Sequence, residues 1–328
     1  MRGKILFNIK SKVINDETTQ LFSCIIALVV LVVTFSILSP YFFTADNLLS
    51  VLMQTTTTAL LGIGSLYVII GQAVDLSVGP VLAMCSVMVA TFLANNWPVW
   101  LSCTITLFCG LLLGLLNGLL ITKMELTPFV ATIGTQMVIR GMALVITDSR
   151  AVYISKRPEF RVLGQGRFLG IIQYPVIIMF VLAVIAAFIL KKTVIGRHVY
   201  ALGSNEEAAR LSGIHTHGIR IFTYMVSAGM AAVAGILVTA RVNSGQPSIG
   251  IAYEADAIAA CVIGGASMNG GRGTVVGTLM GACIIGILTN GLNLIGISTN
   301  WQQVTTGCVL IIAVFVDVLR QRKRKKAK

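Results

Sequence analysis

Charged residues are scarce in this sequence. Of its 328 residues, 11% are Asp, Glu, Lys or Arg, whereas soluble domains carry about 25%. The hydrophobic fraction is 56% and the mean hydropathy is +0.88. A run of about 20 apolar residues crosses a bilayer, and the chain contains many such runs in succession. The composition excludes an ordinary soluble domain and predicts an all-α polytopic membrane protein.

Motifs for chemistry or nucleotide binding are also missing. The glycine-rich stretch GGASMNGGRGT (264–274) lacks the Gly-Lys-Ser/Thr ending of a phosphate-binding loop. Seven cysteines occur without CxxC spacing, and no carboxylate or thiolate is placed to complete a metal site with the three histidines. We therefore expect no catalytic residue, no cofactor and no metal, and the protein is not expected to be an enzyme.

The formal net charge of +13 is distributed in a way that argues against nucleic-acid binding. The basic residues cluster at the amino end, in segment 191–220 and in a tail: Arg2, Lys4, Lys10, Lys12, and the run from Arg320 to Lys328. In membrane proteins such clusters mark the cytoplasmic side. Both termini are therefore expected in the cytoplasm, which requires an even number of membrane crossings.

The hydrophobic pattern predicts ten spans within a single domain of residues 1–328. A cytoplasmic segment 1–20 precedes the ten-span core 21–319, and the basic tail 320–328 follows it. The segment 254–269 is the weakest span because it is short and opens with Glu254 and Asp256. The ten spans are 21–39, 51–71, 77–94, 99–121, 127–147, 174–190, 219–240, 254–269, 273–296 and 300–319.

A weak internal similarity suggests that the ten spans form two halves. GLLNGLL (114–120) resembles GILTNGLNL (286–294), which pairs Asn117 with Asn290. Asp75 and Asp256 each precede a span and are separated by a similar distance in the sequence. Two five-helix halves necessarily have opposite orientations, so this pattern predicts an inverted five-plus-five repeat.

Asp75 allows two interpretations. Residues 51–94 hold two spans and a short connection, which places Asp75 near the inner interface. There its carboxylate, with Ser77, would cap the first N–H groups of the next helix and complement the helix dipole. The alternative is a proton-coupled secondary transporter that uses Asp75 as its proton carrier, because ionisable groups within membranes are commonly functional.

Two further polar features within the spans have open roles. Arg140 lies 13 residues into the span 127–147, and it either extends to the outer surface or lines a transport path. The threonines of segment 55–58 either face an aqueous path or bond to their own helix backbone. The sequence does not decide between these alternatives.

Two polar loops are candidates for contact with partners. The loop 148–173 is expected outside yet is basic, so it is either a docking surface or simply solvated; its candidate docking residues are Arg150, Lys156, Arg157 and Arg161. The segment 204–213 is predicted to form a short helix, with Ser204 as N-cap, Glu207 completing a capping box and Gly213 ending it. Its residues, offered to a cytoplasmic partner, are Ser204, Asn205, Glu206, Glu207, Ala208, Ala209, Arg210, Leu211, Ser212 and Gly213.

Several long stretches resemble a known family. VDLSVGP (74–80), PFVATIGT (128–135), GRHVYALGSNEEAARLSGI (196–214) and the region 253–298 are similar to the ribose/xylose/arabinose/galactoside class of ATP-binding-cassette (ABC) importer permeases. FFTADNLLSVL (42–52) and YEADAIAA (253–260) are most similar to the ribose branch. The family usually has Gly-Gly-Ile before the aspartate, where this chain has Gln72-Ala73-Val74.

The resemblance implies a multi-pass permease subunit of the bacterial inner membrane. Such a subunit moves a monosaccharide inward by alternating access and changes no bond. Its implied partners are a second permease copy, identical or paralogous, a cytoplasmic ATPase, a periplasmic sugar-binding protein and membrane lipid. By the same resemblance, 204–213 would be the helix that couples to the ATPase, and loops such as 148–173 would meet the binding protein.

Overall fold

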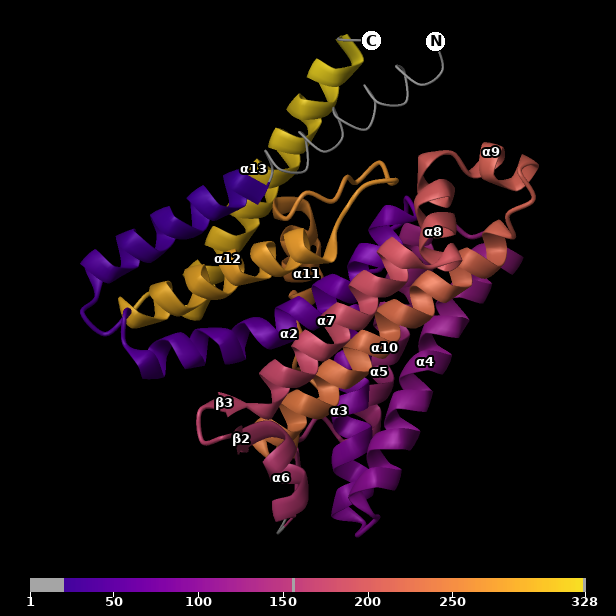
Figure 1. Ribbon diagram of the computed structural model, residues 1–328. Coiled ribbons are helices and arrows are strands. Elements are labelled where there is room, and N and C mark those ends of the chain that lie inside the picture. Colours follow the sequence, from indigo (N-terminus) through magenta and orange to yellow (C-terminus); the bar gives the residue numbers. More distant parts are fainter. Residues whose placement is uncertain (1–20, 155–156, 327–328) are drawn as a thin grey trace.

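The computed structural model describes residues 21–154 and 157–326. The basic residues of segment 1–20 and the predicted docking residue Lys156 lie outside the described residues. Within the described part, nearly all regular structure is helical (Figure 1). The expected all-α polytopic architecture is therefore confirmed as a mostly helical chain with several long apolar helices.

Seven helices of the described residues are long and apolar enough to cross a bilayer. Each lies within a few residues of a predicted span, except that α2 begins six residues earlier than expected. They are Leu21–Leu38, α2 (Ala45–Ile70), α4 (Val99–Lys123), α5 (Pro128–Ile146), α7 (Tyr174–Lys192), α10 (Thr216–Val242) and α12 (Val275–Leu294).

The other predicted spans correspond to a shorter helix, a long C-terminal helix and a half-length helix. They are α3 (Val78–Ala94), α13 (Thr299–Lys326) and α11 (Tyr253–Ile263). The predicted helical span 254–269 is wrong, because α11 has 11 residues and is about 16 Å long, too short to cross a bilayer. Gly265, with a φ of +101°, and three later glycines of positive φ keep the chain non-helical up to Thr274.

Helix α10 lies at the centre of the bundle and packs against α2, α3 and α4 (Figure 1). Glycines recur every fourth residue on the α4 face that meets α10, namely Gly110, Gly114 and Gly118. A Cβ at Gly118 would lie 2.8 Å from the Cα of Ile221, so the two backbones approach as closely as in small-residue interfaces of membrane helices.

The ends of the bundle differ in structure (Figure 1). At one end, residues 148–173 fold as β1 (Val152–Tyr153), α6 (Pro158–Gln165), β2 (Arg167–Phe168) and β3 (Ile172–Gln173). Strand β1 pairs antiparallel with β4 (Ser244–Gly245), and β2 pairs with β3. At the other end, α8 (Val194–Ser204) and α9 (Glu206–Leu211) connect α7 to α10.

Candidate functional site

The connection between α2 and α3 contains Asp75, whose side chain is buried with 2% exposure. Its Oδ1 accepts hydrogen bonds from the N–H of Ser77, at 2.9 Å, and from the Ser77 Oγ, at 2.6 Å. Its Oδ2 accepts one from the Oγ of Ser227, at 2.7 Å. The carboxylate thus bonds Ser77, the residue that precedes α3, and Ser227 of α10. The Ser77 side chain caps no N–H group of α3, so that part of the predicted cap is wrong.

Two more side chains fasten this connection. The Nδ2 of Asn117 on α4 donates to the Ser77 Oγ at 2.8 Å, and the Tyr224 hydroxyl on α10 donates to the Val74 carbonyl at 3.1 Å. Ser227 lies 11 residues after the start of α10, or about 16 Å of helix rise. Asp75 therefore lies about three helical turns along α10, inside the bundle. The buried carboxylate is stable there because Ser77 and Ser227 donate to both of its oxygens.

The asparagines of the predicted repeat have different partners. Asn290 on α12 forms a reciprocal amide pair with Asn47 of α2, with both N···O distances 3.0 Å, whereas Asn117 bonds Ser77. Asp256 lies half-buried in the first turn of α11. The contacts do not reproduce one half of the chain in the other, and the inverted repeat stays a prediction.

Segment 243–252, between α10 and α11, runs inside the bundle along α3. A Cβ on Gly245 would contact Ser86 and Ala90, and one on Gly250 would contact Gly79. Ser244 and Gly245 are extended, whereas residues 247–252 form turns. The segment brings Gly250 and Glu254 against Gly79 at the start of α3.

Arg140 holds the turn residues of this segment. Its Nη1 donates to the carbonyls of Pro247, at 2.7 Å, and Ile249, at 2.6 Å. The guanidinium is therefore directed into the bundle, and it does not extend to the outer surface. Backbone carbonyls of a non-helical segment need such donors at membrane depth, and Arg140 supplies them from α5.

The first turn of α11 carries two acids, Glu254 and Asp256. The Glu254 Oε2 is buried and has no hydrogen-bond partner among the described residues. It lies against Gly79 of α3, and the carboxylate is within electrostatic range of Arg140. A buried carboxylate oxygen without a donor is costly, so this turn differs from the satisfied acid at Asp75.

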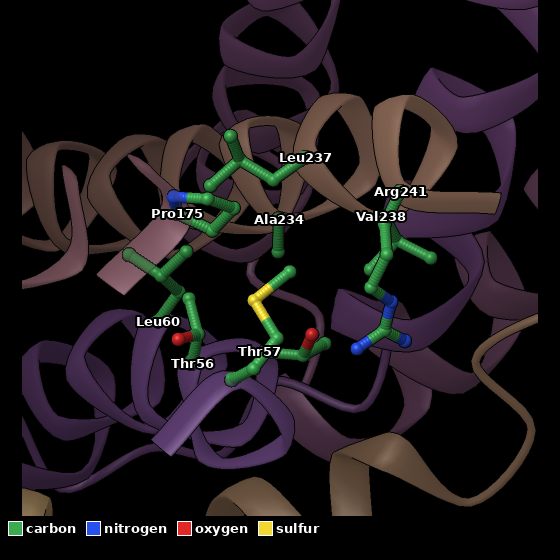
Figure 2. A pocket seen from close by; sticks show the side chains of 9 residues that line it. Thr56, Thr57, Leu60, Pro175, Ala234, Leu237, Val238 and Arg241 are labelled. Atoms are coloured by element: carbon green, nitrogen blue, oxygen red, sulfur yellow. The ribbon is translucent and has the colours of Figure 1, made fainter. Parts of the chain in front are cut away.

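A small pocket lies between α2, α10 and the start of α7 (Figure 2). It holds about 10 Å³ of free volume, enough for one water molecule. Figure 2 shows Arg241 extending from α10 toward the α2 side, where Thr56 and Thr57 lie. The Arg241 side chain makes no hydrogen bond or ion pair within the described part of the chain. The sequence did not single out Arg241, because a basic residue at the end of an apolar helix usually marks only the place where the helix leaves the membrane.

Helix α9 occupies the predicted partner-facing segment, but its cap was predicted wrongly. Ser204 belongs to α8 and its Oγ donates to the Tyr200 carbonyl. Asn205 has extended backbone angles and its Oδ1 accepts the N–H of Ala208 at 2.9 Å, so it is the N-cap. Gly213 ends the helix as expected, with a φ of +82° and the Ile214 N–H bonded to the Ala209 carbonyl.

The described basic residues of loop 148–173 do not form one cluster. Arg157 donates to the Asn96 Oδ1 at 2.9 Å, and Arg161 donates to the Gln165 Oε1 at 2.6 Å. Arg150 and Arg161 are exposed, and Arg157 is half-buried. Arg157 therefore ties the loop to the end of α3, while Arg150 and Arg161, like Arg167, are exposed and accessible to a partner.

These features define a class of protein before any comparison. The described chain is a bundle of apolar helices that contains two non-helical connections, a few buried ionisable groups and a small pocket bordered by Arg241 and two threonines. Such an arrangement is typical of transport proteins, in which intramembrane ionisable groups mark the path.

Comparison with known proteins identifies the family. Residues 47–314 match the family model described as "Branched-chain amino acid transport system / permease component", and the chain belongs to this family of permeases. The ribose import permease protein RbsC of Haemophilus influenzae is 42% identical over 295 residues, covering 89% of this chain and 91% of that protein.

Other curated relatives are also named as permeases of sugars. RbsC of Bacillus subtilis is 41% identical, with 92% of this chain and 94% of that protein covered. The D-allose transport system permease protein AlsC of Escherichia coli is 35% identical, with 89% and 90% covered. No solved structure matches the chain. The chain is thus a transport permease and not an enzyme, and nothing in these relatives supports the proton-coupled alternative.

Proposed function

We propose that the chain is the membrane-spanning subunit of an ABC importer that moves ribose, or a closely related monosaccharide, into the cytoplasm. The observation that carries this proposal is the 42% identity to a ribose import permease along 89% of the chain. The subunit works with a cytoplasmic ATPase and a periplasmic sugar-binding protein in the bacterial inner membrane. A second permease copy, identical or paralogous, completes the pair.

The proposed topology has ten crossings with both termini in the cytoplasm. Seven long apolar helices are supplemented by α3, by α13 and by segment 243–263, which combines a non-helical half with the half-length helix α11. Discontinuous spans of this kind commonly form the substrate path of transporters. The basic clusters at both ends of the chain support the orientation.

The partner surfaces follow from the two ends of the bundle. Helix α9 is the ATPase-coupling element, and Leu211 at its end is 81% exposed, an apolar side chain that a partner would cover. At the opposite end, Arg150 and Arg161 are exposed on the segment that would meet the binding protein. Arg157 contributes by holding this segment against Asn96.

The sugar path is proposed along the discontinuous span. Arg241 and Thr57 lie at its outer part, and Glu254 and Asp256 lie where α11 begins. Guanidinium groups donate to hydroxyl oxygens and carboxylates accept from hydroxyl hydrogens, so this line suits a polyhydroxylated solute. The pocket holds about one water molecule and is closed to a sugar in this conformation, as one stage of alternating access requires.

The proposal is tested by reconstituting the permease in liposomes with the ATPase and sugar-binding protein whose genes neighbour its own. We expect ribose uptake only when both partners and ATP are present. A panel of pentoses and hexoses, measured both for uptake and for binding-protein stabilisation, identifies the sugar. Uptake by the permease alone, driven by a proton gradient, would contradict the proposal and revive the role of Asp75 as a proton carrier.

A further inference from the structure

Three distant segments meet at the cytoplasmic end of the bundle. They are the last turn of α2, the end of α8 and the glycine-rich loop 264–274. The N–H of Gly271 donates to the carbonyl of Ile70 at 2.8 Å. A Cβ on Gly203 would overlap that same carbonyl and would lie 2.7 Å from the Gly271 nitrogen. We call Ile70, Gly203, Gly270 and Gly271 the glycine junction.

The junction is packed backbone against backbone. A Cβ on Gly270 would lie 2.6 Å from the carbonyl oxygen of Gly203, and one on Gly271 would lie 2.6 Å from the Oγ of Ser204. Both loop glycines have left-handed backbone angles, with φ of +77° and +70°. No flexible side chain separates the segments, so a displacement of one backbone must move the others, because packed interiors are stiff.

A side-chain tether supports the same contact. The hydroxyl of Tyr200 on α8 donates to the carbonyl of Gly273 at 2.7 Å. Gly273 is followed by Thr274, whose Oγ1 accepts the N–H of Gly277 and so caps α12. Helix α8 is therefore fixed to the start of α12 by one hydrogen bond and to the end of α2 by the glycine junction.

The junction lies between the proposed ATPase-coupling helix and the loop that follows α11. Gly203 is two residues before Asn205, the N-cap of α9. On the other side, the loop 264–274 joins α11 to α12, and α11 begins beside the proposed sugar path. The junction therefore links the proposed ATPase-coupling helix, through α8, to the loop that follows α11.

We propose that the glycine junction and the Tyr200 tether transmit movement of α9 to α2 and to the α11–α12 pair, so that ATP hydrolysis is coupled to opening of the sugar path. The proposal rests on the proposed function, since it takes α9 as the segment that meets the ATPase. Gly203 and Tyr200 are positioning residues: they touch neither sugar nor nucleotide.

The test compares Gly203→Ala and Tyr200→Phe in the complete importer, reconstituted in liposomes. The controls are Gly218→Ala, whose nearest neighbour would be the His215 Cδ2 at an ordinary 3.7 Å, and Tyr153→Phe, which is 75% exposed. The measured quantity is ribose imported per ATP hydrolysed. We expect Tyr200→Phe to lower this ratio about fivefold, the effect of one lost hydrogen bond. Gly203→Ala should lower it about tenfold or more because its backbone must shift.

A merely structural role predicts a different result. Import and hydrolysis would then fall together with the amount of folded complex, and their ratio would stay at the wild-type value. That outcome, in Tyr200→Phe or in any Gly203→Ala that assembles, overturns the proposal. Wild-type import is measured in parallel: its absence contradicts the proposed function, whereas wild-type import with unchanged variant ratios contradicts only the junction.

Discussion

Two non-helical connections enter the helix bundle, and different contacts hold each of them. Residues 71–77 join α2 to α3, and residues 243–252 join α10 to α11. Both place non-helical backbone at membrane depth, where unsatisfied polar groups are costly. The first is fastened by side chains of α4 and α10 around one carboxylate. The second is fastened at its start by strand pairing of Ser244–Gly245 with β1 and by Asn243, which bonds Ile154. Further along it is fastened to α5 by the guanidinium of Arg140.

The two connections also differ in the solvent exposure of their residues. Asp75 and Ser77 are buried, with 2% and 0% exposure. In the second connection Gln246, Ser248 and Ile251 are exposed, and the acid that follows, Glu254, has a buried oxygen without a donor. The first connection is therefore a fixed structural element. The second is anchored at its start by β1, but its later residues are partly exposed. We expect these later residues to open locally more readily than the first connection.

The largest expected effect comes from breaking the fixed connection with Asp75→Ala. This change leaves the hydroxyl groups of Ser77 and Ser227 without their acceptor inside the bundle. We expect a loss of about 3 kcal/mol of stability, since each buried group left unsatisfied costs about 1–3 kcal/mol. Thermal unfolding in detergent measures it, with the exposed Glu159→Ala as control. An unchanged midpoint would show that the network is not structural.

The isosteric change Asp75→Asn accompanies this experiment as a matched variant. An amide retains one acceptor oxygen for Ser77, so we expect a loss of about 1 kcal/mol and retained ribose import. The pH dependence of import should also be unchanged. Complete loss of sugar accumulation with a normal unfolding midpoint would instead indicate proton transport through Asp75.

The second prediction addresses the partly exposed connection between α10 and α11. Arg140→Gln removes the charged donor from the carbonyls of Pro247 and Ile249, and hydrogen bonds to charged groups contribute about 1.5–3 kcal/mol. Because the segment is partly exposed, we expect local opening without global unfolding. Amide hydrogen exchange should accelerate for residues 246–251 and stay unchanged for 71–77. Equal acceleration in both connections would remove the distinction between them.

Much of the helical framework was predictable from hydrophobic runs and turn residues. Nine of the ten expected spans correspond to helices, because apolar length is a local property. The span 254–269 failed for a physical reason: its apolar residues extend past Ile263, but the glycines that follow adopt left-handed angles that end the helix. A hydropathy average depends only on how apolar the residues are, so it does not detect where the backbone leaves the helical conformation.

The candidate site was less predictable than the framework. The bond between Asp75 and Ser77 could be expected, because residues two apart form such turns locally. The bond from Ser227 to Asp75 crosses 152 positions of sequence, and no local pattern indicates it. The same holds for Arg140, whose two carbonyl acceptors lie more than 100 residues away. The cap of α9 shifted from Ser204 to Asn205 because α8 extends to Ser204, which a short polar stretch does not reveal.

The smallest expected effect tests the left-handed residue of the fixed connection. Gln72 has a φ of +60°, a left-handed conformation that costs an L-residue about 1–2 kcal/mol and costs glycine little. Gln72→Gly removes this strain, although glycine loses more backbone entropy on folding. We expect a net gain of about 0.5–1 kcal/mol in thermal unfolding. Gln72→Ala keeps the Cβ and should give no gain. If glycine destabilises here as it does inside an ordinary helix, the connection is not held at this angle.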